Sequence, residues 1–133
     1  MQFFTRREAA LVEAISARII PADHRPGARE ARVVNYIDHM LSTVYDFQQS
    51  TYRQAVRRLN ELAIRRYRRS FERLSAAKQD LLLSQMERGK IPGWNEASSF
   101  FSMIRTHTVE GIFADPKYHG NAGGVGWKLL GSG

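Results

Sequence analysis

Four histidines are the first residues in this sequence that could do chemistry, as metal ligands or as acid–base groups. His107 and Glu110 stand three residues apart, which places an imidazole and a carboxylate on one face of a helix. A helical di-metal site needs several such pairs from facing helices, and His24, His39 and His119 lie in separate segments without ligand spacing. We therefore expect no metal site, and we expect His107 to be a hydrogen-bonded residue at the edge of the core.

Nucleophilic and phosphate-binding chemistry have no better support. The serines lie at predicted helix caps or within helices, and none stands in the strand-to-helix turn of a nucleophile elbow. The segment HGNAGGVGWKLLG, residues 119–131, is rich in glycine, but Trp127 separates Gly126 from Lys128 and a helix precedes the segment. It therefore fits neither a P-loop nor a dinucleotide-binding loop. No residue pattern in the chain predicts an enzyme by itself.

The same glycine-rich segment has the composition of a docking surface. Glycine permits a backbone to approach a partner closely, and tyrosine and tryptophan are frequent interface anchors. A frayed tail would rarely keep this much apolar surface, although packing back onto the chain's own helices is the alternative. We predict that the tail, residues 115–133, docks on a partner through Tyr118, Asn121, Gly123, Gly124, Gly126, Trp127 and Leu129.

A dense group of arginines lies on the predicted third helix and just beyond it. Residues 53–73 hold eight arginines and two acids, and so carry six of the chain's seven excess positive charges. An acidic protein partner, nucleic acid or an anionic membrane surface could each meet such a face, and a solvated surface without any partner is the fourth interpretation. No recognition-helix motif and no interleaved aromatic residues support nucleic-acid binding. The candidate interface residues are Arg53, Arg57, Arg58 and Arg65.

Helical periodicity predicts the elements that position these residues. Thr5 and Glu8 form a capping box, and apolar residues then recur at helical spacing until Pro21. A second helix is expected from about Ala28. The third and longest is expected over roughly 48–70, with one apolar arc. Arg66 falls inside that arc, where it would need a buried partner or a frayed helix end.

Two further helices complete the predicted core. Ser75 is the expected N-cap of the fourth, and Gly89 is its stop signal. Asn95 is expected to cap the fifth, which closes at the Asp115–Pro116 pair. No segment alternates with a period of two over the length of a strand. The sequence therefore predicts one all-α domain, residues 1–133, of about five helices, with a helical core over 5–114 and an irregular Gly-rich C-terminal tail over 115–133.

The composition excludes several classes of protein. The absence of cysteine removes disulfides, thiolate zinc sites, iron–sulfur clusters and the covalent attachment of c-type haem. No apolar run reaches the ~18 residues of a membrane span. The stretch RREAALVEAISARIIPA superficially resembles a twin-arginine export signal, but Glu8, Glu13 and Arg18 interrupt its apolar run, and we interpret it as a helix.

Two blocks of the sequence resemble a known family. FFTRREAALVEAISARIIPADHRPGAREARVVNYID and HTVEGIFADPKYHGNAGGVGWKLLG are similar to the gluconate 2-dehydrogenase subunit 3 family, the small or gamma subunits of heteromeric flavin-dependent sugar and polyol dehydrogenases. The two blocks cover nearly half of the chain, and the middle is similar in its helical pattern. The positions that match the family pattern are Pro21, Asp23, Pro26, Gly27, Asp115, Pro116, Tyr118, Asn121, Gly126 and Trp127.

The resemblance implies a non-catalytic accessory subunit with no cofactor of its own. In this family a large subunit binds FAD and oxidises the sugar, and a c-type cytochrome often accepts the electrons. The small subunit is thought to assist the folding, export and stability of its large partner, which implies a periplasmic location. The expected partners are therefore the large flavoprotein and a cytochrome subunit, without nucleic acid and without a direct membrane span.

The sequence departs from the family pattern in three respects. It shows no twin-arginine signal ahead of the capping box, and its tail reads GSG where an aromatic-Pro-Gly ending is usual. His119 and Ala122 also stand where glycine and a basic residue are frequent. These departures concern the export route and the tail contacts, and the helical core is unaffected. The competing interpretation is a small basic helical protein that binds nucleic acid.

Overall fold

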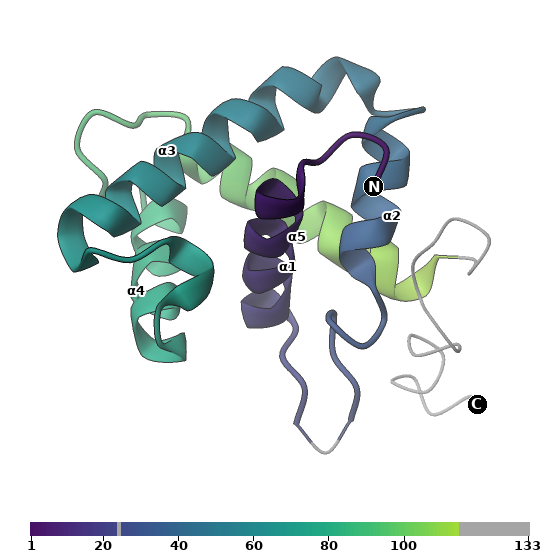
Figure 1. Ribbon diagram of the computed structural model, residues 1–133, viewed down its shortest axis with the longest axis horizontal. Helices are drawn as coiled ribbons and strands as arrows, with labels where there is room; N and C mark the ends of the chain where they lie inside the picture. Colours follow the sequence, from purple (N-terminus) through teal and green to yellow (C-terminus); the bar gives the residue numbers. More distant parts are fainter. Residues whose placement is uncertain (24, 115–133) are drawn as a thin grey trace.

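In the described part of the chain, four α-helices pack around a fifth, α1 (Arg6–Ile19), which is the first in the sequence (Figure 1). The computed structural model describes residues 1–23 and 25–114. The elements that follow α1 are α2 (Val33–Leu41), the 3-10 helix η1 (Asp46–Gln48), α3 (Gln49–Tyr67), the 3-10 helix η2 (Phe71–Arg73), α4 (Ala76–Glu87) and α5 (Ala97–Phe113). Within these described ranges there is no strand, so the predicted all-α class is confirmed.

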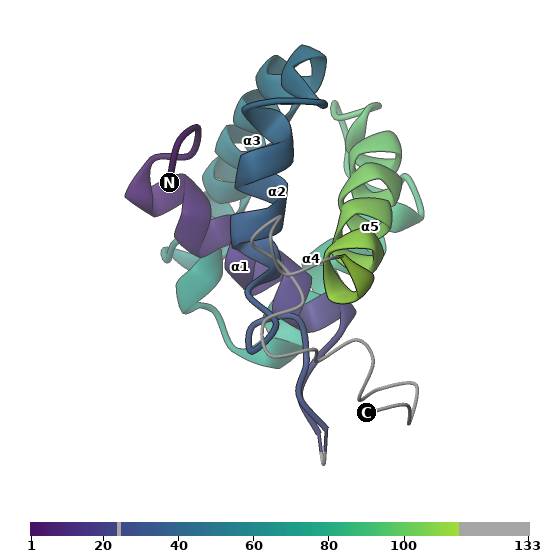
Figure 2. The same ribbon diagram turned by 90° about the vertical axis from the view of Figure 1, so that its right-hand side faces the viewer.

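The helices α1 and α5 form the centre of the arrangement. Helix α5 contacts α1, and it also contacts α2 at one end of the molecule and α4 at the other (Figures 1 and 2). Fully buried side chains from α1, α3, α4 and α5 meet in one core, among them Val12, Ile15, Leu59, Leu82 and Ile104. The predicted apolar arc of α3 is confirmed, because its buried residues are Tyr52, Ala55, Val56, Leu59, Leu62 and Ala63.

The helix-end signals that act within a few residues are where the sequence predicts them. The Glu8 N–H donates to Thr5 Oγ1 at 3.1 Å, and the Thr5 N–H donates to Glu8 Oε1 at 2.8 Å, so the capping box is confirmed. Ser75 Oγ accepts from the Lys78 N–H at 3.3 Å at the start of α4. Gly89 follows the end of α4 with φ of +65°, in the left-handed region that glycine favours.

The start of the second helix differs from the prediction. Helix α2 begins at Val33 and not at Ala28, because residues 28–32 form turns that end at Arg32 in a left-handed conformation, with φ of 55°. Those turns are tied to the end of α1, where the Ala28 N–H donates to Ile20 O at 2.9 Å. A Cβ atom on Gly27 would lie 2.5 Å from Ile20 O, so only glycine fits this close approach.

Two other predictions are wrong, one about the start of the fifth helix and one about the place of Arg66 in the apolar arc of the third. Asn95 is not the cap of the fifth helix, because α5 starts at Ala97 after Glu96, and the Ala97 N–H donates to Trp94 O in the preceding turn. Arg66 does not enter the core. It is exposed at the last turn of α3, where its Nη1 donates to Gln85 Oε1 of α4 at 2.5 Å.

Candidate partner-binding surfaces

The glycine-rich docking segment is the first candidate, and it lies outside the described residues. Its predicted contact residues are Tyr118, Asn121, Gly123, Gly124, Gly126, Trp127 and Leu129. The helix that leads into it carries apolar side chains on its surface, since Val109 is 42% exposed and Phe113 is 43% exposed. Those two side chains, four residues apart, share one face of α5.

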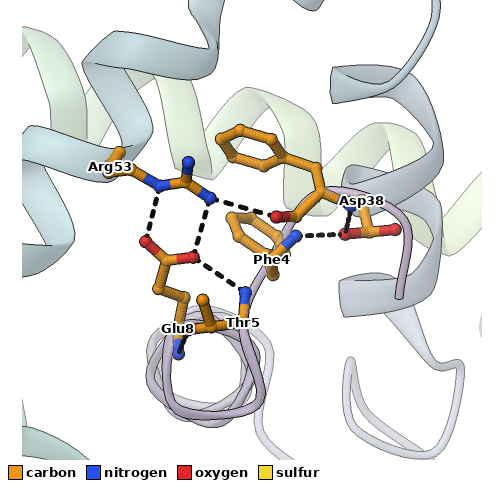
Figure 3. Close-up of polar contacts among 6 residues, drawn as sticks. Phe4, Thr5, Glu8, Asp38 and Arg53 are labelled. Carbon is orange, nitrogen blue, oxygen red and sulfur yellow. Dashed lines mark hydrogen bonds and ion pairs between the residues drawn. The ribbon is translucent and has the colours of Figure 1, made fainter.

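An N-terminal clasp is made by the backbone N–H groups of residues 2–4 and the carboxylate of Asp38. Figure 3 shows the contact between Phe4 and Asp38 close to Arg53, the first residue of the predicted basic interface. Asp38 of α2 is 3% exposed, and its carboxylate accepts three backbone hydrogen bonds. The donors are the N–H groups of Gln2 at 2.7 Å, Phe3 at 3.0 Å and Phe4 at 2.8 Å. Because a buried carboxylate is costly unless it is hydrogen-bonded, these three donors explain why Asp38 is tolerated in the core.

Arg53, the first of the four predicted interface arginines, belongs to this clasp region. Its Nε lies 2.9 Å from Glu8 Oε2 and its Nη2 lies 3.0 Å from Glu8 Oε1, while Nη2 also donates to Phe3 O at 3.0 Å (Figure 3). Its guanidinium carbon stands 4.3 Å from the centre of the Phe3 ring. Partial burial opposes the charge on Glu8, but the hydrogen bonds and charge of Arg53, together with Thr5, lower the pKa of that carboxyl. The role of Arg53 in the folded chain is therefore structural.

The other three predicted arginines lie around the turn between α4 and α5. Arg58 Nη2 donates to Gly93 O at 2.6 Å, and its guanidinium carbon is 5.5 Å from the Trp94 ring centre. The side chains of Arg57 and Arg65 make no hydrogen bond or ion pair with the part of the chain that the structure describes. Together with Arg58, Glu61, Leu62, Ile91, Pro92 and Trp94 they line a groove of about 420 Å³. Of the four, only Arg57 and Arg65 are left for a partner.

A cluster of tyrosines, histidine and glutamate joins α2, α3 and α5. Glu110 Oε1 accepts from Tyr36 Oη at 3.1 Å and from Tyr45 Oη at 2.9 Å. His107 lies between the rings of Tyr45 and Tyr52, with ring centres 4.6 and 5.7 Å away, and its Nδ1 lies 2.7 Å from Tyr52 Oη. The prediction that His107 is hydrogen-bonded is confirmed, although the ring is buried in the core, at 5% exposure, and not at its edge.

The charges in this cluster favour a structural role. Burial lowers the pKa of His107, which is only partly offset by the nearby Glu110 carboxylate. Burial, followed by the charge of Glu110, raises the pKa of Tyr36. The tyrosines therefore stay protonated and donate to Glu110. Across the described ranges, no group of three or more acidic or histidine side chains is placed to hold a metal ion.

None of the described helices combines the length and the apolar character that crossing a bilayer requires.

Comparison with known proteins gives the family. The model of the gluconate 2-dehydrogenase subunit 3 family matches residues 6–133, nearly the whole chain. The chain therefore belongs to this family, and the family description is consistent with an accessory subunit of a dehydrogenase complex. No curated protein and no solved structure matches the chain.

Proposed function

We propose that this member of the gluconate 2-dehydrogenase subunit 3 family is the non-catalytic small subunit of an FAD-dependent sugar or polyol dehydrogenase. Its task is to assist the folding, export and stability of the large flavoprotein subunit. The observation that carries the proposal is the family match over residues 6–133. The described polar groups agree with it, because Glu8, Asp38, His107 and Glu110 are all engaged in contacts that hold the helices together.

The redox chemistry is assigned to the partner subunits. FAD belongs to the large subunit, which removes hydride from the sugar, and a c-type cytochrome is the proposed electron acceptor. This chain has no cysteine, so it offers neither the thioether attachment of a c-type haem nor ligands for an iron–sulfur cluster. We assign it no cofactor of its own, and we assign the complex to the periplasm.

The docking tail supplies the main contact in this proposal. Tyr118 and Trp127 are the anchors, Leu129 adds apolar surface, and Asn121 with Gly123, Gly124 and Gly126 lets the backbone lie close to the flavoprotein. The exposed Val109 and Phe113 extend this surface onto α5. On the basic face the proposal retains Arg57 and Arg65, because Arg53 and Arg58 already bind groups of this chain.

Co-purification from the native host, with mass identification of the partner, tests the assignment directly. We expect a flavoprotein that elutes with this chain and carries all of the flavin absorbance. Expressing the two chains together should raise the soluble yield of the flavoprotein, because a ligand that binds only the native state stabilises it by about 2.7 kcal/mol at a hundredfold excess over Kd. A flavoprotein that folds equally well without this chain would contradict the accessory role.

Salt dependence separates this function from nucleic-acid binding. A complex held by apolar anchors should persist at moderate salt, whereas phosphate contacts lose affinity steeply with salt. Trp127→Ala should weaken the complex by about thirtyfold, the equivalent of 2 kcal/mol, while the neighbouring Lys128→Ala serves as the matched control. An oligonucleotide complex that forms only at low salt, with an affinity that Trp127→Ala does not change, would favour nucleic-acid binding.

A further inference from the structure

A second groove lined by arginines lies where the start of α1 meets the end of α3 and η2. Its volume is about 930 Å³. The sequence alone does not bring its two sides together, because one comes from the first turn of α1 and the other from residues 64–73. Five exposed arginines line this arginine groove: Arg6, Arg7, Arg68, Arg69 and Arg73.

The arginines of this groove differ from Arg18, Arg53 and Arg105, because no carboxylate in the described part of the chain forms an ion pair with them. Arg18, Arg53 and Arg105 each form an ion pair with a carboxylate. None of the five groove arginines forms an ion pair, a hydrogen bond or a ring contact through its side chain within the described ranges. Glu72 is the one carboxylate in the lining, so the groove keeps a large excess of positive charge.

Three of these arginines stand at positions that are unfavourable for the isolated chain. Arg6 and Arg7 are the first residues of α1, where the free N–H groups already make the helix end positive. Arg68 has φ of 61°, in the left-handed region that disfavours residues with a Cβ atom. Choices that contradict local preference in this way are expected where a surface has a function.

The shape and chemistry of the lining indicate what the groove accepts. Arginine presents a planar fork that pairs with a carboxylate through two parallel hydrogen bonds. The groove also includes apolar surface, since Ile64 is 45% exposed and Ala10 is exposed beside it. None of its lining residues is aromatic, so it lacks the platforms on which nucleic-acid bases stack. It also presents no large apolar face of the kind that enters a lipid surface.

We propose that the arginine groove binds an acidic segment of the partner polypeptide, whose carboxylates pair with the arginines while an apolar side chain covers Ile64. The identity of that polypeptide, the flavoprotein subunit, rests on the proposed function. The recognition of an acidic peptide does not, and it is tested on the purified full chain alone.

The probe is a fluorescein-labelled peptide of repeating Glu-Glu-Leu units, with a Gln-Gln-Leu peptide of the same length as its neutral counterpart. The groove variant replaces Arg6, Arg7, Arg69 and Arg73 by Gln and keeps Arg68, whose backbone is strained. The matched control replaces Arg29, Lys78, Arg88 and Lys90 by Gln, which removes the same charge from exposed positions outside the groove. Circular dichroism on each sample checks that all variants are folded.

We expect the chain to bind the acidic peptide and not the neutral one, and the groove variant to bind it at least about tenfold more weakly. The control should change the affinity by less than about threefold, which is a small effect of net charge alone. Equal losses of affinity in both variants would overturn the proposal, because they would show that the net charge of the chain, and not a specific site, attracts the peptide. A single-stranded oligonucleotide, or a vesicle containing phosphatidylglycerol, that binds more tightly than the peptide and loses its affinity in the groove variant would also overturn it.

The native complex distinguishes failure of this inference from failure of the proposed function. If the flavoprotein co-purifies equally with wild type and with the groove variant at every salt concentration, the accessory function stands and the groove inference fails. If no dehydrogenase subunit co-purifies at all, the proposed function fails, and the peptide assay still decides whether the groove recognises carboxylates.

Discussion

The two ends of α3 use the same residue type in opposite ways. Near its start, Arg53 is held by both oxygens of Glu8, by the Phe3 carbonyl and by the Phe3 ring. Past its end, Arg68 and Arg69 stand in a groove with three further arginines, and their guanidinium groups have no partner in the described ranges. A run of arginines in a sequence therefore contains both residues that stabilise the fold and residues that are left for another molecule. Which group an arginine belongs to depends on the residues that contact it in the folded chain.

Removing the Asp38 carboxylate from the N-terminal clasp should have the largest effect on the free energy of unfolding. Asp38→Ala leaves three backbone N–H groups without their acceptor, so we expect the free energy of unfolding to fall by about 3 kcal/mol. Urea unfolding followed by circular dichroism measures it. Asp46→Ala, at an exposed position, is the matched control and should cost no more than about 0.5 kcal/mol. Similar losses of stability in the two variants would show that the three hydrogen bonds of the clasp do not stabilise the fold.

Arg53 and Arg57 compare a bound arginine with an unbound one on the same helix. Arg53→Gln should lower the free energy of unfolding by about 1 kcal/mol, because it removes a two-pronged ion pair that is half exposed. Arg57→Gln should change it by less than about 0.5 kcal/mol. A double-mutant cycle with Glu8→Gln isolates the pair. A coupling energy indistinguishable from zero would remove the distinction between the two ends of α3.

The Glu8–Arg53 pair should also make the stability of the chain depend on pH, with a smaller effect than the substitutions above. The pKa of Glu8 in the folded chain is lowered from its ordinary value of 4.5, so its contribution is complete above pH 4.5. As the pH falls below that value, the unfolded chain takes up the proton first and the contribution is lost. Glu8→Gln should therefore be less stable than wild type at neutral pH, and the difference should shrink below pH 4.5. A difference that grows on acidification would contradict this account.

A substitution in the arginine groove should change the free energy of unfolding least, and it should raise it where the others lower it. Arg7→Glu replaces a cation by an anion in the first turn of α1, so the isolated chain should become more stable by about 0.5 kcal/mol. The same variant should bind the acidic peptide more weakly. Thermal unfolding and the peptide assay on one preparation provide both numbers. A loss of stability would show that Arg7 has a structural role, as Arg53 does.

The parts of the fold that sequence predicts well are those decided within one helical turn. Thr5 with Glu8, Ser75 and Gly89 act on neighbours three or four residues away, and all of them mark helix ends as expected. The apolar arc of α3 also follows from its own spacing. The start of α2 could not be predicted in this way, because the turns before it depend on the approach of Gly27 to Ile20.

The candidate surfaces depend on contacts between distant residues, which no local pattern encodes. Asp38 binds residues that lie more than thirty positions earlier, and the arginine groove joins the start of α1 to residues 64–73. The count of arginines was available from the sequence, but the acid that neutralises Arg53 comes from another helix. The predicted tail residues, from Tyr118 to Leu129, lie outside the described residues, and their docking stays a prediction.

The central position of α1 also has a consequence for the order of events during synthesis. Its buried Leu11, Val12 and Ile15 pack in a core that includes α4 and α5, and α5 begins at Ala97. Until α5 has been synthesised, these side chains have no complete core to enter, and closing the chain between the two helices is entropically costly. The folding of this core therefore waits for α5, and until then the apolar face of α1 lacks the contacts that bury it.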